Sequence, residues 1–342
     1  MKSKENQINK FLFITFAIGF LNVIQIFSYP EFNINCYFYN FLSVQKIPSS
    51  LDFLVDSNER DDAFIVNLAK IRLRPELNIS ENTRIEAHLE LSALYSDKMN
   101  VINPVEEPPN KRQLYNLSET WNEGDVSYKF VTDRLFFKHQ LDFAELIIGR
   151  QRISWGVGRI WQPTDLFNPI NPANFSKFEK DGADAFDFRY YLGDLSDLEI
   201  VYNFTSSEFD NNFGARFRTN VEGYDFSIMT GYFDKRYVGG LDIAGSLLDA
   251  GLRAEAVISF DKDRFESNYY MFILGADYQF NDKLYALVEY QFNGKGTTCK
   301  YCYDLLALLK GEVLNVGQNY IAAMLSYLVH PLVNTNMTII QN

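Results

Sequence analysis

Apolar and polar residues alternate along most of the chain from about Ala63 onward, which is the period of a β-strand with two unlike faces. The alternation is unbroken over residues 84–92 and recurs over residues 69–77. A tight turn at residues 80–82 joins these two segments, so we expect them to pair as a hairpin. Pro75 has no backbone donor, and we expect a bulge in the strand at that position.

The same two-faced pattern returns many times, in segments of roughly 9 to 13 residues separated by residues typical of turns. We count about 14 such segments, which predicts an all-β protein. Further examples are residues 186–190, 198–204, 215–222 and 283–292.

Alternation alone fits two architectures, a soluble β-sandwich and a transmembrane antiparallel β-barrel. The connections favour the barrel, because short ones (residues 80–82 and 142–144) alternate with long ones (residues 98–127 and 156–185). Aromatic residues gather at segment ends, as at Tyr269 and Tyr270, where the interfacial girdles of a barrel lie. Arg and Glu are dense on the polar face, which suits a water-filled lumen better than a sandwich core.

Composition supports this class. The 342 residues include 30 Phe and 21 Tyr, while charged residues still make up 22%. This composition is typical neither of a disordered chain nor of a helical membrane protein. The net charge of −12 argues against a nucleic-acid partner.

The first 29 residues have the features of a secretory signal peptide. Three lysines up to Lys10 precede a largely apolar stretch that ends near Ser28. An N-terminal anchor helix is the alternative, but the stretch is short and contains Asn22 and Gln25. We therefore expect a signal peptide at 1–29, a barrel at 30–342 and a location in the bacterial outer membrane.

The end of the chain falls inside an alternating segment that begins near Leu332. A single-chain bacterial barrel has an even number of strands. We expect that the sequence is truncated at its C-terminus and that the complete barrel has 16–18 strands.

The three cysteines are too few for a disulfide framework. Cys299 and Cys302 form a C-x-x-C pair, which fits a redox pair, half of a zinc site, a local disulfide or two free thiols. No second pair and no nearby His supports zinc, so we favour a local disulfide or free thiols in a surface loop. No phosphate loop or dinucleotide fingerprint occurs either, and we expect no cofactor and no metal.

Residues 149–169, GRQRISWGVGRIWQPTDLFNP, are the most distinctive stretch. Alternation predicts that Arg150, Arg152 and Ser154 project into the lumen from one strand, which two glycines then end. Thr164 is placed to cap a short helical turn. The following loop carries enough aromatic area to pack across the barrel mouth or inside the lumen, either as a constriction that selects anions or as a plug that only stabilises the wall. The constriction residues we expect are Trp155, Trp161, Asp165 and Phe167.

This stretch resembles a signature of outer-membrane porin-like barrels related to the alginate-export type. In that group a strand G-R-Q-x-x-x-W-G leads to a loop W-x-P-T-D-x-F-N-P, and EYQFNGKG at residues 289–296 is similar to a later loop. The resemblance implies a monomeric barrel of about 16 to 18 strands that exports or admits polysaccharides or other polar molecules. It marks Arg150, Gln151, Arg152 and Trp155 as structural positions.

The predicted lumen face is modestly basic, with thirteen cations against eight anions. If opposite charges segregate, they create a path for anions, whereas full pairing leaves a less selective wall. The expected solute path comprises Arg72, Arg74, Arg84, Arg134, Arg150, Arg152, Arg189, Arg216 and Arg218. The other predicted lumen cations are Lys70, Lys138, Arg253 and Lys283, and the anions are Glu76, Glu86, Glu90, Asp187, Glu199, Glu222, Glu255 and Glu289.

These observations favour a porin-like channel whose partners are membrane lipid and a small polar or saccharide solute, with a monomer favoured. A non-transporting barrel that acts as an adhesin, receptor or scaffold through its long loops is the alternative. Catalysis is disfavoured, because His88 between Glu86 and Glu90 is the only histidine placed for proton transfer and no nucleophile turn occurs.

Overall fold

The computed structural model describes residues 30–45, 64–97, 110–168, 179–207, 209–261, 267–303 and 315–342. The signal peptide predicted at residues 1–29 lies outside these residues. Within them no helix has the length and apolar character needed to cross a membrane.

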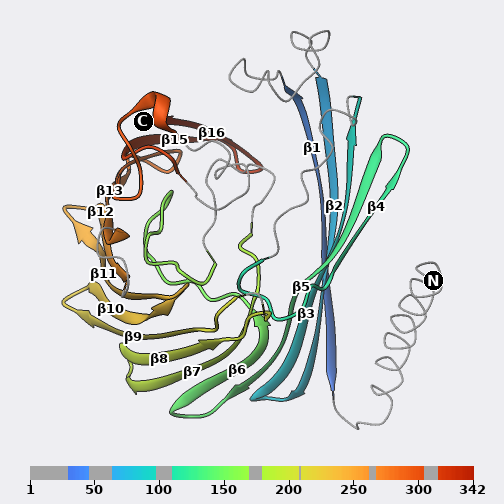
Figure 1. The fold of residues 1–342 in the computed structure, drawn as a ribbon, viewed down its shortest axis with the longest axis horizontal. Helices are drawn as coiled ribbons and strands as arrows, with labels where there is room; N and C mark the ends of the chain where they lie inside the picture. Colours follow the sequence, from blue (N-terminus) through green and yellow to red (C-terminus); the bar gives the residue numbers. More distant parts are fainter. Residues whose placement is uncertain are drawn as a thin grey trace.

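The chain forms one antiparallel sheet of 16 strands that curves around a central space (Figure 1). Fifteen strands follow each other around the sheet, and β4 pairs only with β5, beside the end of β6. The sheet is open between β1 and β16, each of which pairs with one neighbour. The strands are β1 (Glu31–Gln45), β2 (Phe64–Ser80), β3 (Thr83–Ser96), β4 (Ser118–Glu123), β5 (Val126–Gln140), β6 (Ala144–Gln151), β7 (Ala183–Gly193), β8 (Ser196–Asn203), β9 (Asn212–Val221), β10 (Tyr224–Phe233), β11 (Arg236–Leu247), β12 (Ala250–Asp261), β13 (Tyr269–Gln279), β14 (Leu284–Asn293), β15 (Asn319–His330) and β16 (Val333–Gln341), with a 3-10 helix η3 (Lys300–Cys302).

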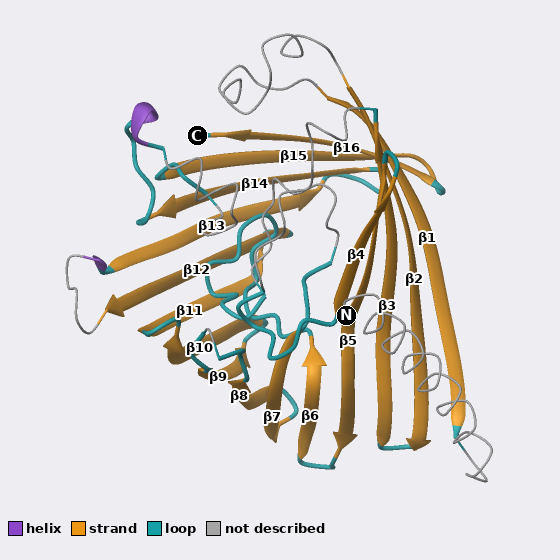
Figure 2. Ribbon diagram, turned by 45° about the vertical axis from the view of Figure 1, so that its right-hand side comes forward, coloured by secondary structure: helices purple, strands orange, loops and turns teal. Residues whose placement is uncertain are grey.

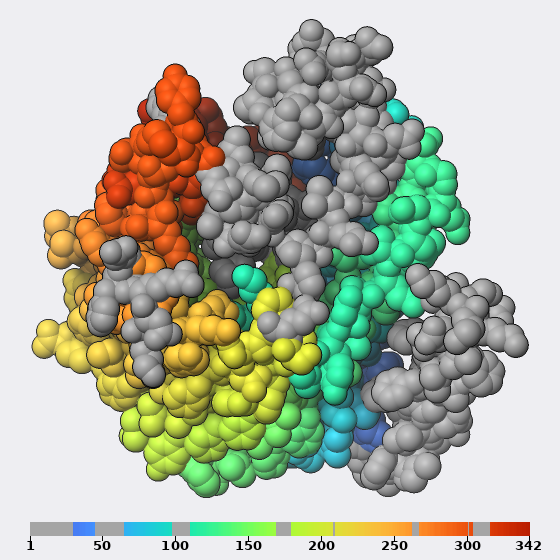
Figure 3. Space-filling view, viewed as in Figure 1, coloured from blue at the N-terminus to red at the C-terminus, as the bar shows by residue number. Residues whose placement is uncertain are grey.

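The alternation in the sequence corresponds to the two faces of this sheet. In β10 Phe226 and Ile228 are exposed on the outer face, while Ser227 and Met229 are buried on the inner face. An exposed apolar outer face is stable only against lipid. Exposed large apolar side chains occur on every strand from β7 to β12, and these strands form a continuous surface in Figure 3. The all-β transmembrane barrel predicted from alternation is therefore confirmed.

The connections alternate as predicted. Turns such as 81–82 and 222–223 close one end of the sheet, which we call the turn end, and most connections at the other end, the loop end, are longer. The sequence pattern missed two of the sixteen strands: β1 precedes the region in which we saw alternation, and β4 lies within a segment assigned to a long connection.

The predicted hairpin of β2 and β3 is confirmed, but the bulge expected at Pro75 is wrong. The register is the same on both sides of it, with Leu73 opposite Leu89 and Glu76 opposite Glu86. A proline without a donor interrupts pairing locally without inserting a residue. The register shift of this hairpin lies nearer the turn, between Asn78 and Ser80.

Candidate functional site

The loop that follows β6 lies inside the curved sheet rather than outside it (Figures 1 and 2). We call residues 152–168 the inner loop. The strand expected to continue through Ser154 ends at Gln151, because the backbone N–H of Ile153 donates to Asn168 Oδ1 (3.0 Å) instead of to a neighbouring strand. Arg152 and Ser154 are therefore loop residues, and the predicted strand row of three polar side chains is wrong.

Glu255 on β12 fixes the first part of the inner loop. One carboxylate oxygen accepts the N–H groups of Val157 and Gly158, both at 2.5 Å. The other accepts from Thr164, through its backbone N–H (3.1 Å) and its hydroxyl (2.7 Å). The hydroxyl of Thr164 thus bonds the barrel wall and does not cap a helical turn, which corrects the expectation above.

Glu289 on β14 fixes the next turn in the same way. Its carboxylate accepts the backbone N–H groups of Arg159 (2.9 Å), Ile160 (3.1 Å) and Trp161 (2.7 Å). Glu289 is fully buried and Glu255 is 1% exposed. Each buried carboxylate has several N–H donors as partners, which satisfies a charge that would otherwise be costly in the interior.

Gly158 lets the inner loop lie this close to the wall. A Cβ at this position would lie 1.9 Å from the backbone oxygen of Trp161 and 2.4 Å from Ile273 Cδ1. Any side chain would therefore push the loop away from β13. The glycine serves the loop's contact with the wall, whereas the sequence suggested that it ended a strand.

Aromatic side chains of the inner loop pack on apolar wall residues. Trp155 contacts Phe167 edge to face, with ring centres 5.0 Å apart, and Phe167 contacts Phe233 of β10 at 4.8 Å. Trp161 packs with Ile273 and Tyr320. Trp155 and Phe167 are fully buried. The structure places the loop inside the lumen, one of the two locations expected for it.

Lys180 closes the inner loop on itself. Its ammonium group contacts Asp165 and Gln162 and donates to Ser154 Oγ (3.1 Å). The predicted constriction residue Asp165 is buried in this ion pair at 1% exposure. Its other oxygen accepts from the N–H of Asn168.

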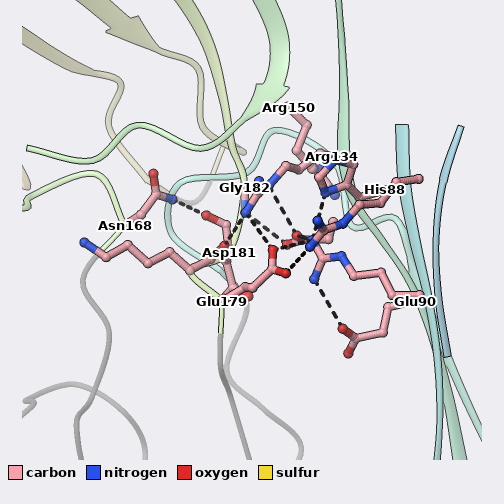
Figure 4. Close-up of polar contacts among 12 residues, drawn as sticks. His88, Glu90, Arg134, Arg150, Asn168, Glu179, Asp181 and Gly182 are labelled. Carbon is pink, nitrogen blue, oxygen red and sulfur yellow. Dashed lines mark hydrogen bonds and ion pairs between the residues drawn. The ribbon is translucent and has the colours of Figure 1, made fainter. Parts of the chain in front are cut away.

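Glu179 lies between the inner loop and β7. It contacts the opposite side of the lumen wall, which is formed by β1, β2 and β5 (Figure 4). Its carboxylate accepts from Tyr37 Oη (3.0 Å) and from Arg134 Nη2 (3.3 Å), and it contacts Arg74. Arg72 Nη2 lies 3.3 Å from the same carboxylate. The segment after β6 is thus bound to both sides of the lumen.

Arg72 is the centre of this polar cluster. Its Nη2 lies 3.1 Å from His88 Nδ1 and contacts Asp133 as well as Glu179. The ligand atoms of these three residues are close enough to hold a metal ion, but the guanidinium group lies among them and supplies the positive charge itself. His88 is buried and also bonds Glu86 (2.7 Å), so it belongs to this network.

The attachment of Glu179 is expected to depend on pH. Burial by itself raises the pKa of Glu179, but Arg72, the Tyr37 hydroxyl, Arg74 and Arg134 together lower the pKa below its ordinary value of 4.5. A lowered pKa stabilises the folded state above the unfolded-state pKa, and this contribution is lost as pH falls through the folded pKa. We expect protease cleavage near Glu179 to rise as pH falls below the ordinary carboxyl pKa of 4.5.

The matched variant for this prediction is Glu179→Gln. It has no charge to lose, so its cleavage by a neutral protease should already exceed that of the native protein at neutral pH. Its cleavage by an acid-active protease should change little as pH falls. If the native protein and this variant showed the same pH dependence, another group would be responsible.

Most of the predicted lumen cations are paired. Arg150 is buried, donates to Asp184 through Nε (2.8 Å) and Nη2 (2.9 Å), and donates to the backbone oxygen of Thr132. Arg150 lies where β5, β6 and β7 meet, and it uses its N–H donors in these contacts rather than for a solute. The other pairs are Lys70–Glu90, Arg84–Glu86, Lys138–Glu145, Arg189–Glu199, Arg216–Glu199, Arg218–Asp197 and Arg253–Asp277.

Two arginines of the inner loop differ from those of the wall. Arg152 and Arg159 are exposed, and among the described residues neither has an ion pair. Arg152 was expected in the solute path, and Arg159 was missed because the glycines around it suggested only a loop. Two predicted lumen charges lie elsewhere, since Glu222 (φ 52°) is in the β9–β10 turn and Lys283 is in the β13–β14 turn.

The cysteine pair lies in the connection between β14 and β15. Cys299 and Cys302 form a disulfide, while Cys36 on β1 is free and exposed. The local disulfide is one of the two alternatives that we favoured.

Comparison with known proteins bears on the fold alone. No protein-family model and no curated protein sequence matches this chain. The structure of Salmonella typhi OmpF in complex with daunomycin is similar, with a TM-score of 0.51, 10% identity, and coverage of 92% of this chain and 90% of that chain. A triple mutant of the Rhodopseudomonas blastica porin matches with a TM-score of 0.49, 9% identity, and coverage of 91% and 94%.

The architecture is therefore that of a transmembrane β-barrel of the bacterial porin fold. Such barrels belong to the outer membrane, which is the location that the fold assigns to this chain. The likeness to porins does not extend to the finer relationship with the alginate-export type.

Proposed function

We propose that this protein is a non-enzymatic outer-membrane channel for small polar solutes, that the inner loop is its constriction, and that the channel prefers anions. This proposal rests on one difference: the cations of the wall form ion pairs, whereas two cations of the inner loop do not. Arg152 and Arg159 are exposed without an ion pair among the described residues, while Arg72, Arg150 and Arg216 on the wall are neutralised by carboxylates. An unpaired guanidinium group inside a lumen attracts anions and repels cations.

The solutes in this proposal include saccharides, since the resemblance to alginate-export barrels implies polysaccharides or other polar molecules. Lumen tyrosines support a polar organic solute as well as a simple ion. Tyr37 and Tyr39 stack with ring centres 6.5 Å apart on β1, beside Arg74 and Lys70 of β2. Aromatic faces next to charged donors offer a sugar both stacking and hydrogen bonds.

The test is ion selectivity, measured as the reversal potential of single channels in a planar bilayer under a salt gradient. We expect the double variant R152A/R159A to lose most of the anion preference. R150A is expected to lower stability but to keep the selectivity, because Arg150 is buried in structural contacts. Lys235→Ala, at an exposed turn, is the control for surface charge.

Two outcomes would contradict parts of the proposal. A folded barrel that carries no current would overturn the channel and favour an adhesin, receptor or scaffold. An anion preference that survives in R152A/R159A would overturn the role of these two arginines.

A further inference from the structure

We propose that the disulfide between Cys299 and Cys302 is a thiol-exchange site, to which a small thiol dissolved outside the cell attaches reversibly. The bond lies in the connection between β14 and β15 and joins residues three positions apart in the sequence. This site is separate from the constriction, and the inference does not depend on the proposed channel function.

This disulfide does not join distant parts of the chain. A disulfide stabilises a fold mainly by closing a loop of the unfolded chain, and the stabilisation grows with the length of that loop. The ring closed here spans only residues 299–302. The connection is held independently, because Thr297 pairs with Gly317 in an isolated bridge and Asn293 Nδ2 donates to the backbone oxygen of Gly317 (3.1 Å). We therefore expect the barrel to stay folded when the S–S bond is cleaved.

Both cysteines are accessible from the medium. Cys299 and Cys302 are exposed, and so is Tyr301 between them. In Figure 2 the helix η3 lies away from the sheet, near the ends of β14 and β15 that this connection joins. The long connections of outer-membrane barrels face the outside of the cell, so an external thiol reaches the bond without crossing the membrane. Exposed disulfides are also reduced more readily than buried structural ones.

The backbone keeps the two cysteines close to each other without help from the S–S bond. The N–H of Cys302 donates to the backbone oxygen of Cys299 (2.9 Å), and the N–H of Cys299 donates to Thr297 Oγ1 (3.1 Å). Neither hydrogen bond involves sulfur. When an external thiol has attacked one sulfur, the other is therefore released beside it and is placed to displace that thiol again. This arrangement makes the attachment reversible.

The reaction is thiol–disulfide exchange. The thiolate of an external thiol RSH attacks one cysteine sulfur, so that a mixed disulfide forms, the bond between Cys299 and Cys302 breaks, and the other cysteine leaves as a thiolate that takes up the proton. A second RSH attacks the mixed disulfide in the same way, which releases RSSR and leaves two protein thiols. The external thiols are oxidised and the protein disulfide is reduced, so the exchange needs no other oxidant or reductant.

The test uses the full chain folded in detergent micelles, with Cys36→Ser as background because Cys36 is a free thiol. The protein is incubated with reduced glutathione, quenched with acid and alkylated, and mass spectrometry counts protein thiols and attached glutathione. We expect the folded protein to react within about threefold of the rate of the same protein unfolded in urea. In C36S/C302S, which lacks the second sulfur, the mixed disulfide formed with oxidised glutathione should persist at least about tenfold longer than in reduced C36S.

Two results would overturn the exchange site. A disulfide that resists glutathione in the folded protein and reacts only after unfolding would be shielded from thiols. A barrel that loses its β-sheet circular dichroism on reduction would need the bond for its fold. The variant C36S/C299S/C302S is the control, and it should fold like C36S and take up no glutathione. A protein that exchanges thiols but carries no current would contradict only the proposed channel function.

Discussion

The double variant E255Q/E289Q is expected to release the inner loop and to raise single-channel conductance, with larger current noise. Each glutamine keeps one acceptor oxygen but loses the charge, and together these two carboxylates accept six backbone N–H bonds and one hydroxyl bond. Hydrogen bonds to charged groups contribute about 1.5–3 kcal/mol each. A loss of about 3 kcal/mol already shifts the loop equilibrium by roughly 100-fold.

Glu76→Gln is the matched control for this experiment. Glu76 is a half-buried glutamate of the wall strand β2, whereas Glu255 and Glu289 are buried, and no described contact joins Glu76 to the inner loop. It removes one negative charge without removing an attachment, so conductance should stay near that of the native channel. If E255Q/E289Q conducted like E76Q, the two carboxylates would not hold the constriction.

The strands of the barrel wall could be predicted because each strand's side-chain pattern depends only on the two environments that the strand separates. A strand between lipid and water must alternate, and the hairpin of β2 and β3 shows this from the side-chain pattern alone. The sequence pattern did not predict β4, because its residues are exposed along almost the whole strand and it has no buried face. Local patterning therefore identifies strands that separate two environments and misses those that do not.

The attachments of the inner loop could not be predicted in this way. Glu255 and Glu289 look like any other charged residue on a lumen face, and their partners are backbone N–H groups, which every loop residue except proline has. The pairing depends on where the loop lies in three dimensions. The sequence indicated that residues 149–169 pack inside or across the barrel, but it did not indicate which wall residues hold them.

A bulge explains another missing part of the site. Opposite β3, His88 pairs with Arg134 and Leu89 pairs with Thr132, so Asp133 is an extra residue in β5. Asp133 and Arg134 can therefore both contact Arg72 or Glu179 although they are adjacent in sequence. Strict alternation places one of two adjacent residues on the outer face. It placed Arg134 on the lumen face, where the structure has it, but it did not predict that Asp133 also faces the lumen.

Arg72→Ala is expected to destabilise the barrel by about 3–5 kcal/mol, because it leaves one buried acid, Asp133, and two half-buried acids, Glu90 and Glu179, without their shared cation. The Arg72 side chain is 3% exposed and reaches Glu90 (3.3 Å), Glu179 (3.3 Å) and Asp133. Arg218→Ala is the matched control, since Arg218 also pairs on the inner wall (Asp197, 2.6 Å) but is 45% exposed, and its loss should cost less than about 1 kcal/mol. The measurement is denaturant unfolding in detergent micelles followed by tryptophan fluorescence. Equal losses in the two variants would show that the cluster around Arg72 contributes no more than a surface ion pair, and the loop would then depend on Glu255 and Glu289 alone.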